Sequence, residues 1–361
     1  MATSFIKAQS PIQCQLCKTD VTLKWKCTKC ELFMCENCKI TKHSSEKHRV
    51  ISVKDICKDI SGRIKSLNLP EIVASVFNSY DTDLHGIGKV LCNEDDIVFF
   101  MGNCDFGKHK FIKGKLLKAS LKVLLNYDIR CMDFSVNNKD EILFAPPPGK
   151  EIVAASASGT AKSIVHASPM VILAIHTTKH GELIIGMRDQ GQKYPITEKS
   201  SRQVAIFDAE YKRKSVFEFD STGKKLFNYA GRIATDSNYN VYVVDWMDNE
   251  LRGQIIGMNK SGYKNFSYTG HPLFNTDDVP LVPMDIAVTS NDVIIISDRN
   301  NHTLHALNPQ GELCGIQLTQ NIGIILPYSL SVDSSGFLVI GCTSYNGEDD
   351  KAKMFVVKLL V

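Results

Sequence analysis

The sequence lacks any long apolar run. A membrane-spanning helix needs roughly 18 consecutive apolar residues, whereas the longest runs in this chain of 361 residues are short, such as Met170 to Ile175. The first thirteen residues also lack the apolar core of a secretory signal peptide. These absences argue against a membrane protein and against a secreted one, so we expect a cytoplasmic protein without a membrane partner.

The sequence also has little net charge. The formal charge is +3, and residues 1–60 carry eleven Lys and Arg against six Asp and Glu. The remaining 301 residues carry 31 against 33, so this larger region is not a general binder of polyanions. Hydrophobic residues are 43% and charged residues 22%, a balance typical of a globular protein and not of a disordered one.

Signatures of catalysis are missing as well. The sequence has no Gly-rich phosphate loop, no nucleophile elbow and no evident Ser/His/Asp arrangement. His176 and His180 are four residues apart but flank a predicted strand turn, so they would not share a helical face. We therefore expect a protein that is not an enzyme and has no small-molecule substrate. Three aspartates recur at the ends of repeats, where short carboxylates cap turns, although they could also line a channel: Asp245, Asp298 and Asp333.

Cysteine, in contrast, is concentrated near the N-terminus. Seven of the twelve cysteines lie within the first 57 residues, and six of these form three Cys-x-x-Cys pairs. Tight pairs in an intracellular chain usually indicate a metal site. Two histidines follow the third pair and complete the set of candidate ligands: Cys14, Cys17, Cys27, Cys30, Cys35, Cys38, His43 and His48.

The spacing of these ligands favours two interleaved zinc sites. Zinc prefers four sulfur or nitrogen ligands at the corners of a tetrahedron. The second and third pairs are only four residues apart and would crowd a single ion. If the first and third pairs share one ion, and the second pair and the histidines share the other, that crowding is relieved. The sequence therefore predicts a cross-braced finger with two zinc ions.

This pattern resembles the B-box zinc finger of the tripartite-motif family over residues 12–50. Many B-boxes have His where this chain has Cys17. Zinc accepts either ligand, so this difference concerns the B-box subtype and not the metal. The resemblance implies that the first ion is bound by Cys14, Cys17, Cys35 and Cys38, and the second by Cys27, Cys30, His43 and His48. Four protein ligands per ion imply structural zinc that does not activate water.

A short helical linker is expected between the finger at 10–50 and the next domain. Within 51–70, four apolar residues lie three or four positions apart and would share one face of a helix: Ile56, Ile60, Ile64 and Leu67. Pro70 would end that helix. The stretch covers about two heptads, which is too short to predict the coiled coil that the family normally places here.

The rest of the chain, 71–361, contains a repeat. A polar turn followed by a short β-branched strand recurs most plainly at 233–245, 286–298 and 330–341. The first strand residues after these turns are 41 to 58 residues apart: Ile97, Ile142, Leu183, Val241, Val293 and Phe337. Each interval accommodates a four-stranded antiparallel sheet, and six such sheets form a β-propeller. Ile72 to Phe77 is the candidate strand that closes the ring beside 354–360.

One copy of the repeat resembles the NHL repeat, whose signature pair is Asn301-His302 here. A B-box before an NHL-type propeller is similar to RING-less members of the tripartite-motif/NHL group. In that family the RING recruits a ubiquitin-conjugating enzyme. Only thirteen residues precede Cys14 in this sequence, so we expect no autonomous ubiquitin ligase activity.

The strongest basic stretch runs from 108 to 122. NHL propellers in some relatives bind RNA, so the candidate nucleic-acid-binding residues are Lys108, Lys110, Lys113 and Lys115. Strand alternation would send Lys113 and Lys115 to the same face. Lysines on the outermost strand of a propeller blade also prevent edge-to-edge aggregation, and we favour that interpretation.

Together these patterns predict a mainly β protein: a small two-zinc finger, a short helical linker and a six-bladed propeller. The favoured function is a zinc-binding, non-catalytic adaptor whose two domains each dock a protein partner. A component of a ubiquitin-ligase complex that uses the RING of a partner chain is one alternative. An RNA-binding regulator that acts through the propeller is the other.

Overall fold

The computed structural model describes residues 16–17, 25–27, 33–43, 50–52, 69–102, 110–127, 129–156, 159–272, 274–344 and 351–361. The chain divides into two compact units. The first comprises Met1–Leu69 and Tyr345–Asp350, and the second comprises Pro70–Ser344 and Lys351–Val361. The predicted linker helix lies outside the described residues. None of the helices in the described ranges is long and apolar enough to cross a membrane.

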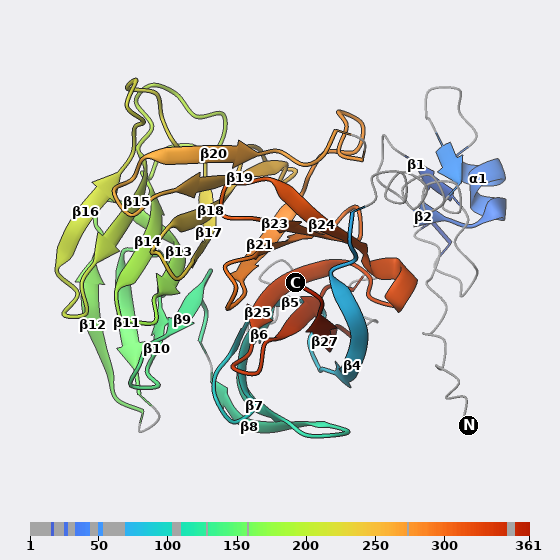
Figure 1. Cartoon of the computed structure of the whole chain (residues 1–361), viewed down its shortest axis with the longest axis horizontal. Helices are drawn as coiled ribbons and strands as arrows, with labels where there is room; N and C mark the ends of the chain where they lie inside the picture. The colour runs from blue at the N-terminus through green and yellow to red at the C-terminus, as the bar shows by residue number, and fades with distance from the viewer. Residues whose placement is uncertain are drawn as a thin grey trace. The chain divides into compact units, whose positions relative to one another are not determined.

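The first unit contains a three-stranded antiparallel sheet and one short helix (Figure 1). Its elements are β1 (Trp25–Cys27), β2 (Phe33–Met34), α1 (Glu36–Lys42) and β3 (Val50–Ser52). Cys35 caps the helix, because its sulfur accepts a hydrogen bond from the backbone N–H of Cys38 at 3.4 Å. Met34 and three cysteines are buried, and this small core would not stabilise the unit without further cross-links.

The second unit is a six-bladed β-propeller, and each blade is a four-stranded antiparallel sheet (Figure 1). Blade one contains β5 (Ile87–Cys92), β6 (Ile97–Gly102), β7 (Phe111–Leu116) and β8 (Leu121–Tyr127). Blade two contains β9 (Phe134–Val136), β10 (Ile142–Phe144), β11 (Glu151–Ala155) and β12 (Ala161–His166). Blade three contains β13 (Val171–Thr177), β14 (Leu183–Arg188), β15 (Arg202–Phe207) and β16 (Arg213–Phe217).

Blade four contains β17 (Ala230–Thr235), β18 (Val241–Trp246), β19 (Gly253–Met258) and β20 (Lys264–Tyr268). Blade five contains β21 (Pro283–Val288), β22 (Ile294–Asp298), β23 (Thr303–Leu307) and β24 (Leu313–Leu318), followed by the 3-10 helix η2 (Thr319–Ile322). Blade six contains β25 (Pro327–Val332), β26 (Phe337–Cys342), β27 (Lys353–Leu359) and β4 (Val73–Asp81).

The sequence repeat corresponds to the second strand of each blade. Five of the six aligned residues begin such a strand, and β22 begins at Ile294, one residue after the aligned Val293. These strands are buried because blades pack on both of their faces; β18, for example, is buried at every position. The prediction of a six-bladed propeller is therefore confirmed.

Aspartates cap the turns and links of the propeller. Asp333 accepts hydrogen bonds from the backbone N–H groups of Ser335 and Phe337, at 2.9 and 2.8 Å. Asp245 accepts the N–H groups of Asn228 and Tyr229, each at 2.7 Å, and so fastens the segment that leads into β17. Asp298 accepts the N–H of Val282 at 3.2 Å in the corresponding place of blade five. Asp333 thus caps its own turn, as expected, whereas Asp245 and Asp298 lie at strand ends and bind the segment that precedes the first strand of their blade.

The ring is closed by two segments from opposite ends of the propeller sequence. β4 pairs with β27, with Val73 opposite Leu359 and Tyr80 opposite Met354 (Figure 1). The predicted closing strand, Ile72 to Phe77, is thus confirmed, although the observed strand extends to Asp81. β4 is the first strand of the propeller along the chain and β27 is the last. Blade six therefore forms only when both ends of the propeller sequence are present.

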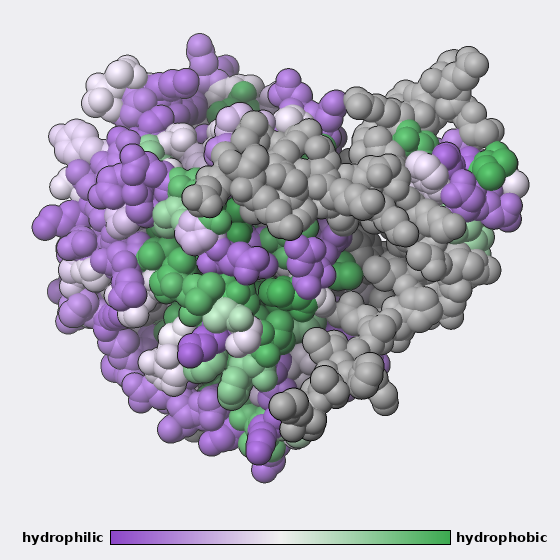
Figure 2. Space-filling model, turned by 45° about the vertical axis from the view of Figure 1, so that its right-hand side comes forward, coloured by the Kyte–Doolittle hydropathy of each residue, from purple (hydrophilic) through white to green (hydrophobic). Residues whose placement is uncertain are grey.

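The surface of the propeller is uneven in hydropathy. Figure 2 shows hydrophilic side chains around the periphery and hydrophobic ones gathered in the middle of the face turned toward the viewer. Beneath the surface, apolar clusters fill the spaces between neighbouring blades, as where Trp246 of blade four packs with Met284 of blade five. Each fully buried large aliphatic side chain contributes about 1.5–3 kcal/mol, so the inter-blade packing dominates stability.

Candidate functional site

Three cysteine sulfurs meet in the N-terminal unit. Cys17 lies in a turn, Cys35 caps α1, and Cys38 lies in the first turn of that helix. Their sulfur atoms all lie within 4.8 Å of one another, and those of Cys17 and Cys35 are 4.0 Å apart. Two thiolates on one tetrahedral zinc ion at about 2.3 Å would be separated by about 3.8 Å. The three sulfurs therefore fit zinc, and they bring Cys17 of the first pair together with both cysteines of the third pair.

The other predicted ligands are only partly described. Cys27 ends β1 and is fully buried, and His43 follows α1 as its C-cap. Three residues lie outside the described ranges: Cys14, Cys30 and His48. A second zinc site, formed by Cys27, Cys30, His43 and His48, stays a prediction. Both sites would be structural, because four protein ligands leave no coordination position for substrate.

The predicted basic residues lie on blade one. Lys113 and Lys115 are on β7, Lys110 precedes this strand, and Lys108 lies outside the described ranges. The ammonium nitrogen of Lys113 is 5.0 Å from the ring centroid of Phe99, a cation–π contact. Lys115 lies opposite Lys122 of β8. β7 is the third strand of its sheet, so Lys113 and Lys115 do not lie on the outermost strand as the edge-protection interpretation expected; on that strand, β8, the lysine is Lys122.

The two histidines noted in the sequence do not form a site. His176 lies on β13, and its Nε2 is 2.9 Å from the hydroxyl oxygen of Thr235. His180 lies in the following turn and packs against Tyr239, with ring centroids 5.4 Å apart and the rings tilted by 37°. His180 also lines a cavity of about 700 Å³ between blades three and four, where Lys214 pairs with Glu182 at 2.6 Å. Their different neighbours rule out a shared metal.

The sequence interpretation missed four charged residues at the propeller axis, which we call the axial cluster: Lys89, Asp133, Arg232 and Asp285. All four are buried. Lys89, Arg232 and Asp285 are each the third residue of the first strand of a blade and follow a break in register with the second strand. The signal that could have found them is a single charged residue at this position in an otherwise apolar strand.

Contacts within the axial cluster join blades one to three. The Lys89 ammonium group lies 2.7 Å from Oδ1 of Asp133 and donates to the carbonyl oxygen of Ile175 at 3.2 Å. The other oxygen of Asp133 accepts the N–H of Ile175 at 2.7 Å. The pKa of the neighbouring His176 is lowered to about 4, first by burial and then by the charge of Lys89.

Arg232 connects blade four with blade one. Its Nη2 donates to the carbonyl oxygen of Gly88 at 2.9 Å, and its guanidinium lies 3.8 Å from the carboxylates of both Asp133 and Asp285. Asp285 accepts the N–H of Leu330 on blade six at 2.9 Å. Burial raises the pKa of Asp285, and Arg232 opposes that effect.

The axial cluster has two positive and two negative side chains, each at most 7% exposed. A divalent cation prefers carboxylates that lack a positive neighbour. Here Lys89 and Arg232 already neutralise the acids, so the cluster provides its own counterions. Chemically it acts as a buried cross-link between blades, and it is poorly suited to hold a divalent metal.

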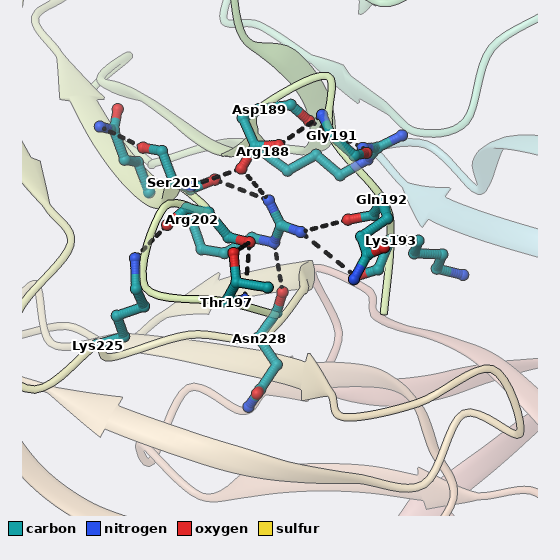
Figure 3. A network of polar contacts seen from close by, with 12 residues as sticks. Arg188, Asp189, Gly191, Gln192, Lys193, Thr197, Ser201, Arg202, Lys225 and Asn228 are labelled. Carbon is teal, nitrogen blue, oxygen red and sulfur yellow. Dashed lines mark hydrogen bonds and ion pairs between the residues drawn. The ribbon is translucent and has the colours of Figure 1, made fainter. Parts of the chain in front are cut away.

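A long ordered loop between β14 and β15 accounts for the largest interval of the repeat. Figure 3 shows the guanidinium of Arg202, which is fully buried, at the centre of this loop. It donates to Asp189 at 2.6 Å and to the carbonyl oxygens of Gln192 and Asn228 at 2.9 Å each. Burial opposes ionisation of Asp189, but backbone N–H groups and Arg202 lower its pKa. The loop 189–201 is therefore held in one conformation.

This loop presents a lysine and a tyrosine beside an aromatic stack. The Tyr194 hydroxyl donates to the carbonyl oxygen of Trp246 at 2.8 Å. The rings of Tyr194 and Tyr229 are 6.0 Å apart, and those of Tyr229 and Trp246 are 5.7 Å apart. The Lys193 ammonium group lies 4.7 Å from the Tyr229 ring. The loop 189–201 thus holds the ammonium group of Lys193 and the ring of Tyr194 in fixed positions.

The Asn301-His302 pair has a structural role. Asn301 donates from its side-chain amide to Asp298 at 2.5 Å, and Nδ1 of His302 accepts the N–H of Leu326 at 3.0 Å. His302 has a left-handed backbone, with φ of 51°. The pair therefore locks the loop between β22 and β23 to the start of blade six.

Comparisons with solved structures support the propeller fold. A luciferin-regenerating enzyme is 12% identical over 78% of this chain and 95% of its own, with a TM-score of 0.55. A gluconolactonase from Xanthomonas campestris is 12% identical over 81% and 96%, with a TM-score of 0.55. Regucalcin from Agrobacterium tumefaciens, a calcium-binding protein, is 8% identical over 81% and 95%, with a TM-score of 0.53. At these identities the likeness shows the fold alone.

Sequence comparisons identify the N-terminal unit. No curated protein matches the chain significantly. Residues 9–53, however, match the family model of the B-box zinc finger. The match includes every predicted ligand and the three clustered sulfurs. The chain is thus a zinc-binding-domain protein, with a B-box zinc finger at its N-terminus and a six-bladed β-propeller after it.

Proposed function

We propose that this protein is a zinc-binding, non-catalytic adaptor, in which the B-box docks or orients one protein and the propeller docks another. The observation that carries the proposal is the axial cluster. Side chains from several blades converge at the axis, which makes it the natural place for a catalytic metal or a small ligand. In this chain two cations and two carboxylates, joined by three ion-pair contacts, occupy that place, which disfavours the chemistry that the names of the structural neighbours suggest.

The loop 189–201 supports a docking role for the propeller. Binding costs less entropy when the binding loop is ordered beforehand. Arg202 supplies that order through its bonds to Asp189 and to loop carbonyls. Lys193 and Tyr194 lie half-buried on this loop. Tyrosine is among the residues enriched at protein interfaces, and the charge of Lys193 would favour an acidic partner.

The finger would contribute a second surface. We propose two structural zinc ions, with Cys14, Cys17, Cys35 and Cys38 on the first and Cys27, Cys30, His43 and His48 on the second. Metal binding supplies folding energy to a unit this small, so the docking surface of the finger would exist only in the zinc-bound state. We also propose that the chain is related to RING-less tripartite-motif/NHL proteins. This relationship rests on the repeat that contains Asn301 and His302.

Affinity purification of the full chain with mass spectrometry tests this function. Three forms are compared: the wild type, Cys35→Ser in the finger, and the double variant Lys193→Glu, Tyr194→Ala in the loop. We expect one set of captured proteins to be lost with the finger variant and a different set with the loop variant. Both sets should survive ribonuclease treatment.

Two results would replace the adaptor with an alternative. Capture that disappears after ribonuclease treatment would favour an RNA-binding regulator. Co-purification of a RING protein and a ubiquitin-conjugating enzyme would favour a ubiquitin-ligase component. Purified chain that forms polyubiquitin without any RING partner would contradict the proposal outright.

A further inference from the structure

The outer strand of blade one exposes aliphatic side chains. Val123, Leu124 and Leu125 of β8 are 48%, 38% and 43% exposed. Leu117, in the turn before β8, is also exposed. β8 is the last strand of its sheet, so one backbone edge has no strand beside it among the described residues (Figure 1). An exposed apolar edge strand is an aggregation hazard unless it serves as an interaction site.

Other outer strands of the propeller are more polar or are covered. β12, β16 and β20 expose mainly lysine, arginine, serine and asparagine, as in the Lys264-Asn265 start of β20. β24 is covered, because the N–H of Ile316 donates to the carbonyl oxygen of Pro70 at 3.2 Å. β8 therefore differs from these four strands, whereas β4, the outer strand of blade six, also exposes the apolar side chains of Val76 and Phe77.

The last two strands of blade one and the turn between them carry charge of one sign. Residues 110–127 include five lysines and no aspartate or glutamate: Lys110, Lys113, Lys115, Lys118 and Lys122. Lys115 and Lys122 face each other across β7 and β8. Like charges directly opposite one another are destabilising, so these lysines favour a negatively charged partner.

The apolar surface continues onto blade six. The Tyr80 hydroxyl of β4 donates to the carbonyl oxygen of Leu117 at 2.9 Å, and the Asn78 side chain donates to that of Lys118 at 2.8 Å. These bonds hold β4 against the β7–β8 turn. Phe77 of β4 is 69% exposed and packs on Phe337, with ring centroids 5.1 Å apart. The edge is thus fixed in place by a second blade.

We propose that β8 docks an extended, acidic segment of a partner protein, which adds to blade one as a fifth strand. Backbone hydrogen bonds along β8 supply affinity, aliphatic side chains of the segment cover Val123, Leu124 and Leu125, and its carboxylates pair with the lysines. Pairing with a second copy of this chain is disfavoured, because it brings two lysine-rich edges together. The inference rests on the proposed adaptor function and names the kind of partner.

The test uses the full chain and a labelled peptide of about ten residues, the length of a long strand, that alternates glutamate and valine. A matching peptide has lysine in place of glutamate, and a third has proline in its centre. The proposal predicts binding of the acidic peptide alone, weakened by added salt. Hydrogen exchange should slow at the amides of Leu121–Tyr127 when this peptide binds.

Two variants locate the contact. Leu124→Glu should weaken binding of the acidic peptide by about tenfold or more, since it removes an apolar contact and adds a repelling charge. Val216→Glu is the matched control, because Val216 is 39% exposed on β16, the corresponding strand of blade three. Thermal melting of both variants checks that the propeller remains folded.

Several results would overturn the inference. The lysine peptide could bind as well as the acidic one, no peptide could bind, or both variants could bind equally. Sedimentation could show a dimer that Leu124→Glu dissolves, which would assign the edge to a second copy. Capture of partner proteins that persists in Leu124→Glu, without peptide binding, would reject this edge while leaving the adaptor function intact.

Discussion

The ammonium nitrogen of Lys89 lies 2.7 Å from a carboxylate oxygen of Asp133, inside the axis of the propeller. Lys89 belongs to blade one and Asp133 to blade two. The guanidinium of Arg232, from blade four, lies 3.8 Å from the same oxygen. One carboxylate thus balances two cations in a place that water barely reaches. This relationship gives the axis its structural role and has direct consequences for stability.

Asp133→Asn should destabilise the propeller strongly. The amide keeps the shape of the carboxylate but removes the negative charge that Lys89 and Arg232 face. Leaving a buried charge without its partner typically lowers the free energy of unfolding by about 3–5 kcal/mol. Chemical denaturation of the full chain measures the effect. Asp83→Asn is the matched control: Asp83 is also 2.7 Å from a lysine, Lys351, but this pair is exposed and screened by solvent, so the change should cost far less. Equal effects would contradict the account.

Arg202→Met should loosen the loop 189–201 without unfolding the propeller blades. The substitution removes the donors to Asp189, Gln192 and Asn228, so the loop loses its fixed conformation. Faster hydrogen exchange at Gly191 and new protease cleavage within the loop are expected. Arg213→Met, on an outer strand, should change neither. A loop that stays protected in Arg202→Met would show that other contacts hold it.

Stability should fall as the pH decreases from about 6.5 to about 4, in part because of His176. Its pKa is lowered from 6.5 to about 4 in the folded state by burial and by Lys89. Between these values the unfolded state binds more protons than the folded state, so acidification favours unfolding. Denaturation at several pH values should show a flatter profile for His176→Gln. The exposed His166→Gln is the control, and identical slopes for all three proteins would exclude this contribution.

Cys35→Ser should unfold the finger and leave the propeller intact. The thiolate of Cys35 belongs to the sulfur cluster, and its sulfur also caps α1 through the N–H of Cys38. The two units share no predicted zinc ligand, so the melting transition of the propeller should keep its midpoint. Circular dichroism with and without a zinc chelator measures both units. A joint loss of both transitions would mean that the units fold together.

The propeller could be predicted because its signal is periodic. The strand starts at Ile97, Leu183 and Val241 mark second strands that are buried between blades, and burial imposes the β-branched pattern that the sequence shows. The closing pair of β4 and β27 followed from the requirement that a ring have no open edge. The cysteine spacing likewise predicted that Cys17 would lie beside Cys35 and Cys38, because a tetrahedral ion restricts the options.

Other features depend on tertiary structure that no local pattern reveals. Lys89 and Arg232 are single charges in apolar strands, and only the register breaks of β5 and β17 show that both point to one axis. Arg202 acts on a loop that does not repeat. Leu124 is exposed because β8 is an outer strand, and no local pattern separates it from the buried aliphatic residues of the other strands. The local sequence does not reveal whether a strand is the innermost or the outermost of its blade, and that position determines what these residues contact.

The central claim is that the finger binds metal and that the propeller, with its own counterions at the axis, binds none. Elemental analysis of the full chain, purified with zinc and calcium in excess and then desalted, tests it most directly. We predict two zinc ions per chain, which are lost in a variant with both Cys27→Ser and Cys35→Ser, and no calcium. A further ion that persists in this variant and disappears in Asp133→Asn would place a metal at the propeller axis and contradict the account.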